Sequence, residues 1–162
     1  MNKGFAEKVL YSPIKDYFLR KFRNAGFPKV HLEITCGGSF SSNLRDMLRA
    51  EMAFLSRRFA PDLTGYIKDG ERIALISIEV KTKEVGFNEI FQAKGYGELL
   101  RAKFAFLISR KPLSPTVRQF LRGREGLLYY GYPDVKVMYI GRFNLETKSM
   151  VDEDWHPKSP FS

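Results

Sequence analysis

Two carboxylates and a lysine stand at the ends of two predicted strands. Between residues 63 and 80 an alternating segment, an Asp-Gly turn and an apolar, β-branched run follow one another, which is typical of a β-hairpin. Such a hairpin brings Asp62, at the start of its first strand, beside Glu79, near the end of its second. Because side chains alternate across a strand, Glu79 and Lys81 point to the same face. The sequence therefore predicts two carboxylates and an amine at one strand end.

These residue types suggest a metal site. Two carboxylates that converge on one point repel each other and are costly to bury unless a positive charge joins them. Mg²⁺ is the expected cofactor, with Mn²⁺ able to substitute, because Mg²⁺ takes oxygen ligands and keeps waters for a phosphate-bearing substrate. The metal lowers the pKa of such a water and neutralises charge on the phosphate, while Lys81 positions the water or helps to deprotonate it. The expected chemistry is hydrolysis of a phosphodiester bond.

Further residues make this segment resemble a known superfamily. Pro61-Asp62 and Glu79-Val80-Lys81 match the two halves of the PD-(D/E)XK signature, and Gln92 with Tyr96 fits the Gln-x-x-x-Tyr element that follows it in the RecB-type branch. Each motif is weak alone, but their order in a strand-turn-strand-helix-strand context is more specific. The chain is therefore similar to PD-(D/E)XK nucleases, in layout over about residues 1–110.

The resemblance implies a fold, an activity and roles for single residues. The fold is α/β and restriction-endonuclease-like, with a central mixed β-sheet flanked by helices, and the activity is that of a Mg²⁺-dependent nuclease of the kind used in DNA repair or recombination. The resemblance gives the metal three ligands, which are Asp62, Glu79 and the main-chain carbonyl of Val80. It assigns Gln92 and Tyr96 to holding the lysine or the substrate strand. Alternatively, Tyr96 is a core aromatic and Gln92 a surface residue.

Members of the superfamily often carry a further glutamate on a helix before the hairpin. Glu7 is the best-placed residue for that role, although a solvated glutamate on a helix face explains it equally well. It belongs to a helical pattern over residues 5–25, which Ser12-Pro13 divides into two helices or bends as one. Glu33, in the predicted strand 30–35, is a weaker competitor because its neighbours Leu32 and Ile34 are expected to face the core.

Basic residues supply candidates for contacts with a polyanion. The formal net charge is +9, which supports nucleic-acid binding once a phosphodiesterase site is in view. Arg57 and Arg58, at the end of a helix predicted from Leu44 to about Phe59, are favoured for phosphate contact. Lys83 and Lys94 lie near the proposed site and are further candidates, as are Gln92 and Tyr96. All of these basic residues could equally belong to solvated faces.

The length of 162 residues fits one domain. The hydrophobic content of 44% excludes a disordered chain. We expect a core over residues 1–143 and an irregular tail from 144 to 162. The helix 87–103 and the strands 104–109 and 135–140 complete the expected sheet and its cover. A single cysteine, and no apolar run long enough to span a membrane, favour a cytoplasmic protein without a membrane partner.

Other function classes find little support in the sequence. There is no Cys/His spacing for zinc, no Walker loop, no dinucleotide fingerprint and no triad of a covalent hydrolase. Two alternatives to a nuclease stay open, which are a non-catalytic nucleic-acid-binding module with the same fold and an unrelated α/β domain with polar strand ends. The expected partner is nucleic acid, with DNA favoured. A homodimer and single-stranded, duplex, flap or junction substrates all remain open.

Overall fold

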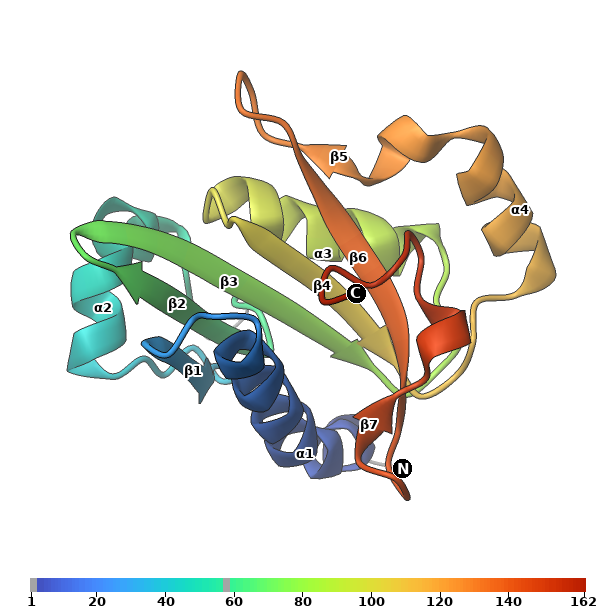
Figure 1. Cartoon of the computed structure of the whole chain (residues 1–162), viewed down its shortest axis with the longest axis horizontal. Helices are drawn as coiled ribbons and strands as arrows, with labels where there is room; N and C mark the ends of the chain where they lie inside the picture. The colour runs from blue at the N-terminus through green and yellow to red at the C-terminus, as the bar shows by residue number, and fades with distance from the viewer. Residues whose placement is uncertain (1–2, 57–58) are drawn as a thin grey trace.

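The computed structural model describes residues 3–56 and 59–162 (Figure 1). Its centre is a seven-stranded sheet with the order β1-β2-β3-β4-β6-β5, in which β7 also pairs with β6. In chain order the strands are β1 (Val30–Ile34), β2 (Leu63–Asp69), β3 (Arg72–Lys81), β4 (Phe104–Ser109), β5 (Tyr129–Tyr130), β6 (Lys136–Asn144) and β7 (Ser149–Met150). The helices in the described ranges are α1 (Lys3–Asn24), α2 (Ser42–Leu48), α3 (Phe87–Leu99) and α4 (Pro115–Gly123), with 3₁₀ segments η1 (Arg49–Phe54), η2 (Glu125–Leu128) and η3 (Asp152–Asp154).

The sheet is mixed, as expected for the α/β class. β1, β2 and β3 form an antiparallel meander, whereas β3, β4 and β6 run parallel to one another. The parallel step from β3 to β4 is made through α3, because parallel neighbours need a crossover connection. β3 and β4 are buried over most of their length, which explains their continuous apolar sequences.

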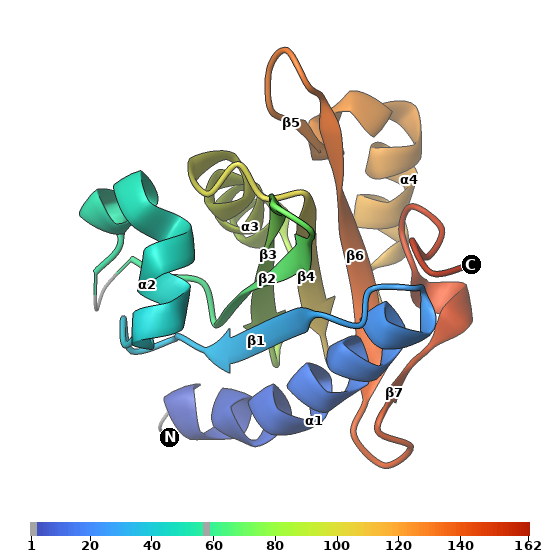
Figure 2. The same cartoon turned by 60° about the vertical axis from the view of Figure 1, so that its left-hand side comes forward.

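One face of the sheet is covered by α1. Leu10, Ile14, Phe18 and Phe22 recur every four residues along this helix, and all four side chains are fully buried. They pack on the inward side chains of β2, β3 and β4 in one core cluster. α1 is a single helix that contains Pro13, so the sequence pattern on either side of Ser12-Pro13 belongs to one element. Figure 2 shows α1 running across this face.

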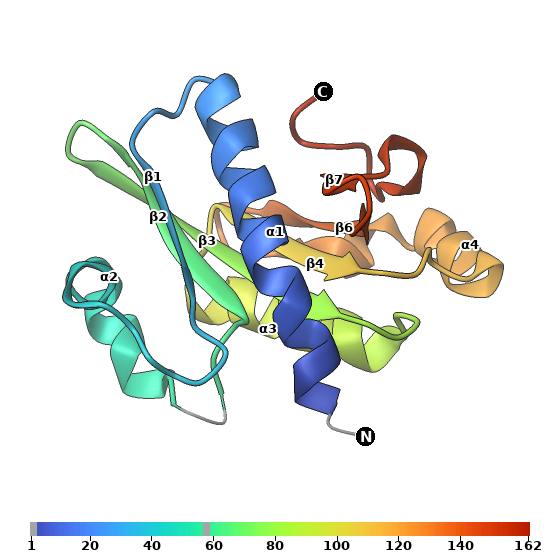
Figure 3. The same cartoon turned by 90° about the horizontal axis from the view of Figure 1, so that it is seen from below.

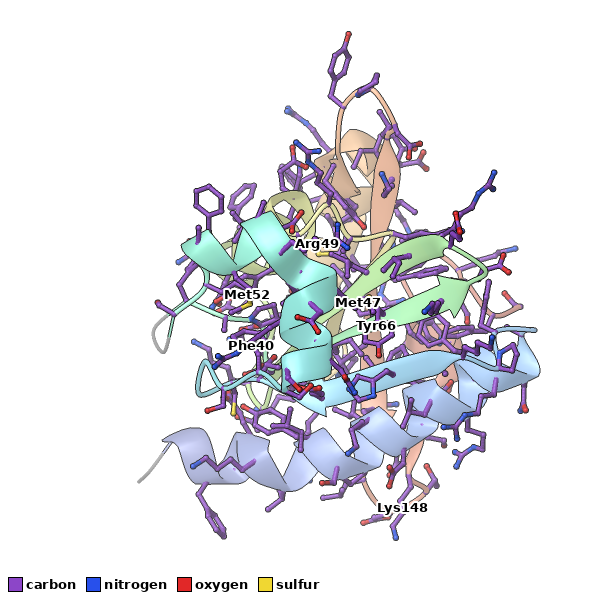
Figure 4. All side chains as sticks on the ribbon, turned by 90° about the vertical axis from the view of Figure 1, so that its left-hand side faces the viewer. Phe40, Met47, Arg49, Met52, Tyr66 and Lys148 are labelled. Carbon is purple, nitrogen blue, oxygen red and sulfur yellow. The ribbon has the colours of Figure 1, made fainter. Side chains whose placement is uncertain are left out.

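The opposite face is covered by α3 and α4, and Figure 3 shows α1 and α3 on opposite sides of the sheet. Ile90 and Ala93 of α3 and Val117 and Leu121 of α4 pack with β4 and β6 in a second core cluster. A third cluster joins α2 to the outer part of the same face. Figure 4 shows the side of the molecule on which α2 lies, with Met47 on α2 and Phe40 and Tyr66 close to this helix.

The predicted hairpin is present. β2 and β3 pair from Leu63↔Ile78 to Asp69↔Arg72, which leaves Gly70 and Glu71 as the turn. Gly70 has φ +61°, a conformation that glycine adopts without strain. Gly65 lies in the middle of β2, where a Cβ atom would stand 2.0 Å from the carbonyl oxygen of His31. Glycine is therefore required there for β1 to pair closely with β2.

Two predicted helices are shorter in the structure. The helix predicted to reach about Phe59 is α2, capped by the Ser41 side chain, and it ends where Arg49 takes φ +45° and the chain continues as η1. Left-handed backbone geometry cannot continue an α-helix, and sequence periodicity does not reveal it. The helix predicted over 87–103 stops at Leu99, shortly before Arg101 takes φ +49°.

Two further expectations change in the structure. Ile34 is 39% exposed, so only Leu32 of that pair faces the core. The tail from residue 144 contains β7 and η3, and its Trp155 is buried in the cluster beneath α1, so the core extends past residue 143. No helix in residues 3–56 and 59–162 is long and apolar enough to cross a membrane.

Candidate active site

The two predicted carboxylates meet where β2 begins and β3 ends. Asp62 directly precedes β2, and Glu79 and Lys81 occupy the last positions of β3. The parallel strands β3 and β4 also end at this edge, which is where α/β sheets commonly bind ligands. The side chains at alternate positions Ile76, Ile78 and Val80 enter the α1 core, so Glu79 and Lys81 face the other side, toward α3.

Asp62 is buried and held by two donors. The Tyr11 hydroxyl of α1 donates to its Oδ1 atom at 2.9 Å, and the Val80 amide donates to its Oδ2 atom at 2.8 Å. Burial raises the pKa of Asp62, while these two hydrogen bonds and the charge of Lys81 oppose that rise. The carboxylate is therefore fixed in place between α1 and β3.

Glu79 is less completely satisfied. Lys81 Nζ lies 2.8 Å from its Oε1 atom, but its Oε2 atom is buried and has no hydrogen-bond partner within the described residues. Burial, followed by the nearby charge of Asp62, raises the pKa of Glu79 to about 7, while the charge and hydrogen bond of Lys81 and the Asp62 backbone oppose that rise. Burial also lowers the pKa of Lys81, but the charges of Glu79 and Asp62 outweigh it, so this pKa lies above its ordinary value. Two acids thus share one lysine.

The backbone of Val80 adds a candidate oxygen ligand. Its amide points at Asp62, and the N–H and C=O of one strand residue point to the same edge of the strand. The Val80 carbonyl therefore lies on the edge of β3 that Asp62 occupies. Its side chain is fully buried on the α1 face and takes no part in the site.

The structure distinguishes between the two further glutamates. Glu7 is partly buried near the site: burial raises its pKa, and the charges of Lys81, Asp62 and Lys83 all act on it. Glu33 instead accepts hydrogen bonds from the His31 ring, at 2.7 Å, and from the amide and hydroxyl of Ser41. Burial works against ionisation of Glu33, but these bonds outweigh it and lower its pKa. Glu33 fastens β1 to the start of α2 and is not part of the carboxylate pair.

The oxygen atoms at this edge fit a hard divalent cation. No group of three or more His, Cys, Asp and Glu side chains in the described part of the chain is arranged to hold a metal. The set consists of two carboxylates and a main-chain carbonyl, and one carboxylate oxygen is buried and unpaired. Mg²⁺ is bound in this way, by few carboxylates and several waters. A cation would also balance the charge of the two carboxylates, which Lys81 alone does not neutralise.

Gln92 and Tyr96 lie on the flank of α3 that faces the carboxylates. The Tyr96 hydroxyl feels the Gln92 side chain and the charges of Glu79, Asp62 and Lys81. Tyr96 is 2% exposed, whereas Gln92 is exposed. Burial is the main cause that raises the pKa of Tyr96. The tyrosine is thus both a core aromatic and a neighbour of the site, which joins the two alternatives that the sequence left open.

The predicted basic contacts are placed differently from one another. Lys83 is largely exposed and lies 3.2 Å from Glu89, the residue that caps α3. Lys94 turns to the other flank of α3 and donates to the Leu127 carbonyl at 3.0 Å, so it is not brought to the carboxylates. Arg57 and Arg58 lie outside the described residues. Of the two lysines, Lys83 is the one near the site, since its charge acts on Glu7.

Two residues of the site were not predicted from the sequence. Tyr11 holds Asp62, and Thr35 holds the backbone around it: the Thr35 hydroxyl donates to the Pro61 carbonyl at 2.8 Å, and its amide donates to the Asp62 carbonyl at 2.8 Å. Tyr11 lies four residues after Glu7, on the same face of α1. That spacing was the available signal for Tyr11, whereas Thr35 follows a strand without any distinguishing pattern.

A scan against models of known protein families finds no match to this chain. A search of the curated proteins likewise finds no significant match. Any conclusion about function therefore depends on the geometry of the site.

Proposed function

We propose that this protein is a metal-dependent nuclease that hydrolyses phosphodiester bonds of nucleic acid, with DNA the expected substrate. The observation that carries the proposal is the buried, unpaired Oε2 atom of Glu79, which stands beside a second buried carboxylate and a lysine. An unsatisfied buried carboxylate oxygen is rare and costly in a folded protein. A ligand for that oxygen accounts for it, and a divalent cation is the ligand that two carboxylates favour.

The arrangement of elements supports a restriction-endonuclease-like fold for the nuclease. The acidic residue, the Glu-x-Lys strand, the helix with Gln92 and Tyr96 and the next parallel strand follow one another as β2, β3, α3 and β4. This is the strand-turn-strand-helix-strand layout on which the resemblance to PD-(D/E)XK nucleases depends. The net charge of +9 suits a polyanionic substrate.

Each side chain has a distinct role in the proposed reaction. Asp62, Glu79 and the Val80 carbonyl would hold Mg²⁺, which when bound supplies a more acidic water and neutralises charge on the phosphate. Tyr11 and the Val80 amide keep the Asp62 carboxylate in one orientation. Lys81 is fixed by Glu79 and would orient the attacking water or stabilise charge on the phosphate oxygens. Glu7 would complete the acidic set from α1.

Cleavage of labelled single-stranded, duplex, flap, junction and RNA substrates with Mg²⁺ or Mn²⁺ tests this proposal. Wild type is compared with Lys81→Ala and with Lys68→Ala, an exposed lysine near the other end of β2. We expect cutting by wild type and Lys68→Ala, and loss of cutting in Lys81→Ala. Equal cutting by folded Lys81→Ala would overturn the proposal. Salt-sensitive binding without any cutting would favour the non-catalytic binding module.

A further inference from the structure

An exposed aromatic ring lies against the site residue Tyr96. The Phe59 side chain is 45% exposed, and its ring centroid is 4.9 Å from that of Tyr96, with the planes tilted by 45°. Tyr96 is itself buried and close enough to Glu79 and Asp62 to feel their charges. Phe59 therefore precedes Asp62 by three positions and contacts a residue that borders the carboxylates, and part of its ring is open to solvent.

Hydrogen bonds fix the main chain at Phe59. The amides of Ser56 and Phe59 each donate to the other residue's carbonyl, at 3.0 and 3.1 Å. Three residues later the chain reaches Asp62, whose own backbone is tied to Thr35. Fixing the chain on both sides limits the conformations open to Phe59, so that less entropy is lost when a ligand packs on its ring.

Nucleobases are the ligands that match an exposed ring beside a phosphodiesterase site. A base offers an apolar face of the same size, and stacking on aromatic side chains is the usual way in which proteins hold unpaired bases. Bases inside a duplex have both faces covered by their neighbours and cannot stack on such a ring. A phenylalanine has no hydrogen-bonding group, so it cannot distinguish one base from another.

We propose that Phe59 stacks on an unpaired base next to the phosphate that enters the carboxylate site. This inference rests on the proposed function and narrows it: the substrate is single-stranded, or carries unpaired nucleotides at the point of cleavage, and is bound with little sequence preference. The net charge of +9 of the whole chain favours a polyanionic partner over an apolar protein partner.

Binding measured without cleavage tests the inference. Fluorescence anisotropy in EDTA compares a labelled single strand of mixed sequence with a blunt duplex of the same sequence, for wild type, Phe59→Ala and Phe59→Trp. Phe91→Ala is the matched control, because Phe91 is a 53% exposed ring on the other flank of α3. We expect Phe59→Ala to weaken single-strand binding about 5- to 100-fold, and we expect Phe59→Trp and Phe91→Ala to keep it. Duplex binding should change little in any variant.

The outcomes separate this inference from the proposed nuclease activity. Equal single-strand affinity of wild type and folded Phe59→Ala, or tighter binding of duplex than of single strand, would overturn the stacking inference even if the wild type cuts. Loss of binding in Phe59→Ala without cutting by wild type would support stacking and reject the nuclease. Self-association of wild type that Phe59→Ala abolishes would show that a second copy covers the ring, and would also overturn the inference.

Discussion

Glu33 and Glu79 are both strand glutamates, but their surroundings shift their pKa values in opposite directions. Glu33 receives three hydrogen bonds from His31 and Ser41, and its pKa is lowered. Glu79 receives one side-chain hydrogen bond, from Lys81, keeps one buried oxygen without a partner and has its pKa raised to about 7, although the Asp62 backbone also favours its charged form. Both carboxylates are largely hidden from solvent, so burial alone does not separate them. What separates them is whether the protein itself satisfies the charge.

The difference distinguishes a structural acid from one that is incomplete without a ligand. Buried polar groups in folded proteins are nearly always paired, because an unpaired one costs free energy of folding. Glu33 follows that rule and links two elements. Glu79 departs from it at the strand edge where Asp62 and Lys81 also converge, which is the reason to look for a ligand there and not at β1.

The largest expected effect is on catalysis. Asp62→Ala and Lys81→Ala should each lower the cleavage rate by about 100-fold or more, because each removes a group proposed to act on the metal, the water or the phosphate. Glu33→Gln should cut at nearly the wild-type rate. Single-turnover cleavage under matched conditions measures all three. A Glu33→Gln defect as large as that of Lys81→Ala would abolish the distinction between the two acids.

The second prediction concerns stability without metal. Glu79→Gln should add on the order of 1–3 kcal/mol to the free energy of unfolding in EDTA at pH 8. The melting temperature should therefore rise by several degrees. The raised pKa of Glu79 means that the folded state binds the proton more tightly than the unfolded state. This contribution to stability is fully present below about pH 4.5 and is lost as the pH rises through about 7. Thermal melts from pH 5 to 8 should show this loss of stability in wild type and not in Glu79→Gln.

Mg²⁺ should reverse part of this loss. A cation that binds only the folded state raises the melting temperature as its concentration rises, and we expect a shift of a few degrees for wild type at pH 8. Glu79→Ala should show no such shift, whereas Glu33→Gln should respond as wild type does. Melting curves over a Mg²⁺ titration provide the measurement. A full response in Glu79→Ala would place the ion elsewhere.

The smallest effect is expected at Glu33, and its dependence on pH is opposite in sign. Glu33→Gln should lower the free energy of unfolding by about 1 kcal/mol at pH 7, because charge-assisted hydrogen bonds are lost. The lowered pKa of Glu33 means that its contribution is present above the unfolded pKa and disappears as the pH falls through the folded value. Urea unfolding at pH 7 and pH 3.5 checks this, and a deficit that persists unchanged at the lower pH would contradict it.

Local patterns were enough to predict the hairpin and the positions of its acidic residues. Alternation over residues 63–80 and the turn at Gly70 specify β2 and β3, and with them the position of Asp62 and Glu79 just beyond the pair Leu63↔Ile78. The direction of Lys94 could not be predicted in this way. Lys94 and Gln92 lie on different flanks of the same helix, and the packing of α3 on β3 and β4 decides which flank meets the site.

Long-range packing accounts for the other misses. Tyr11 reaches Asp62 because of the way in which α1 lies across the sheet. The packing of Ile14 and Phe18 in the core determines that position. Periodicity shows that this face of α1 is buried but not what it is buried against. The early end of α2 depends on the positive φ of Arg49, which no propensity of arginine suggests.

The hydrogen bond from the Val80 amide to Asp62 continues the ladder of the hairpin beyond its last strand pair, Leu63↔Ile78. The Asp62 side chain thereby imitates the peptide carbonyl that a longer β2 would have offered. An asparagine at this position can still accept from the amide through its side-chain oxygen, and its nitrogen can donate to the Tyr11 hydroxyl. Asp62→Asn is thus a near-isosteric substitution that removes the negative charge while keeping the hydrogen bond to the Val80 amide at the end of the strand.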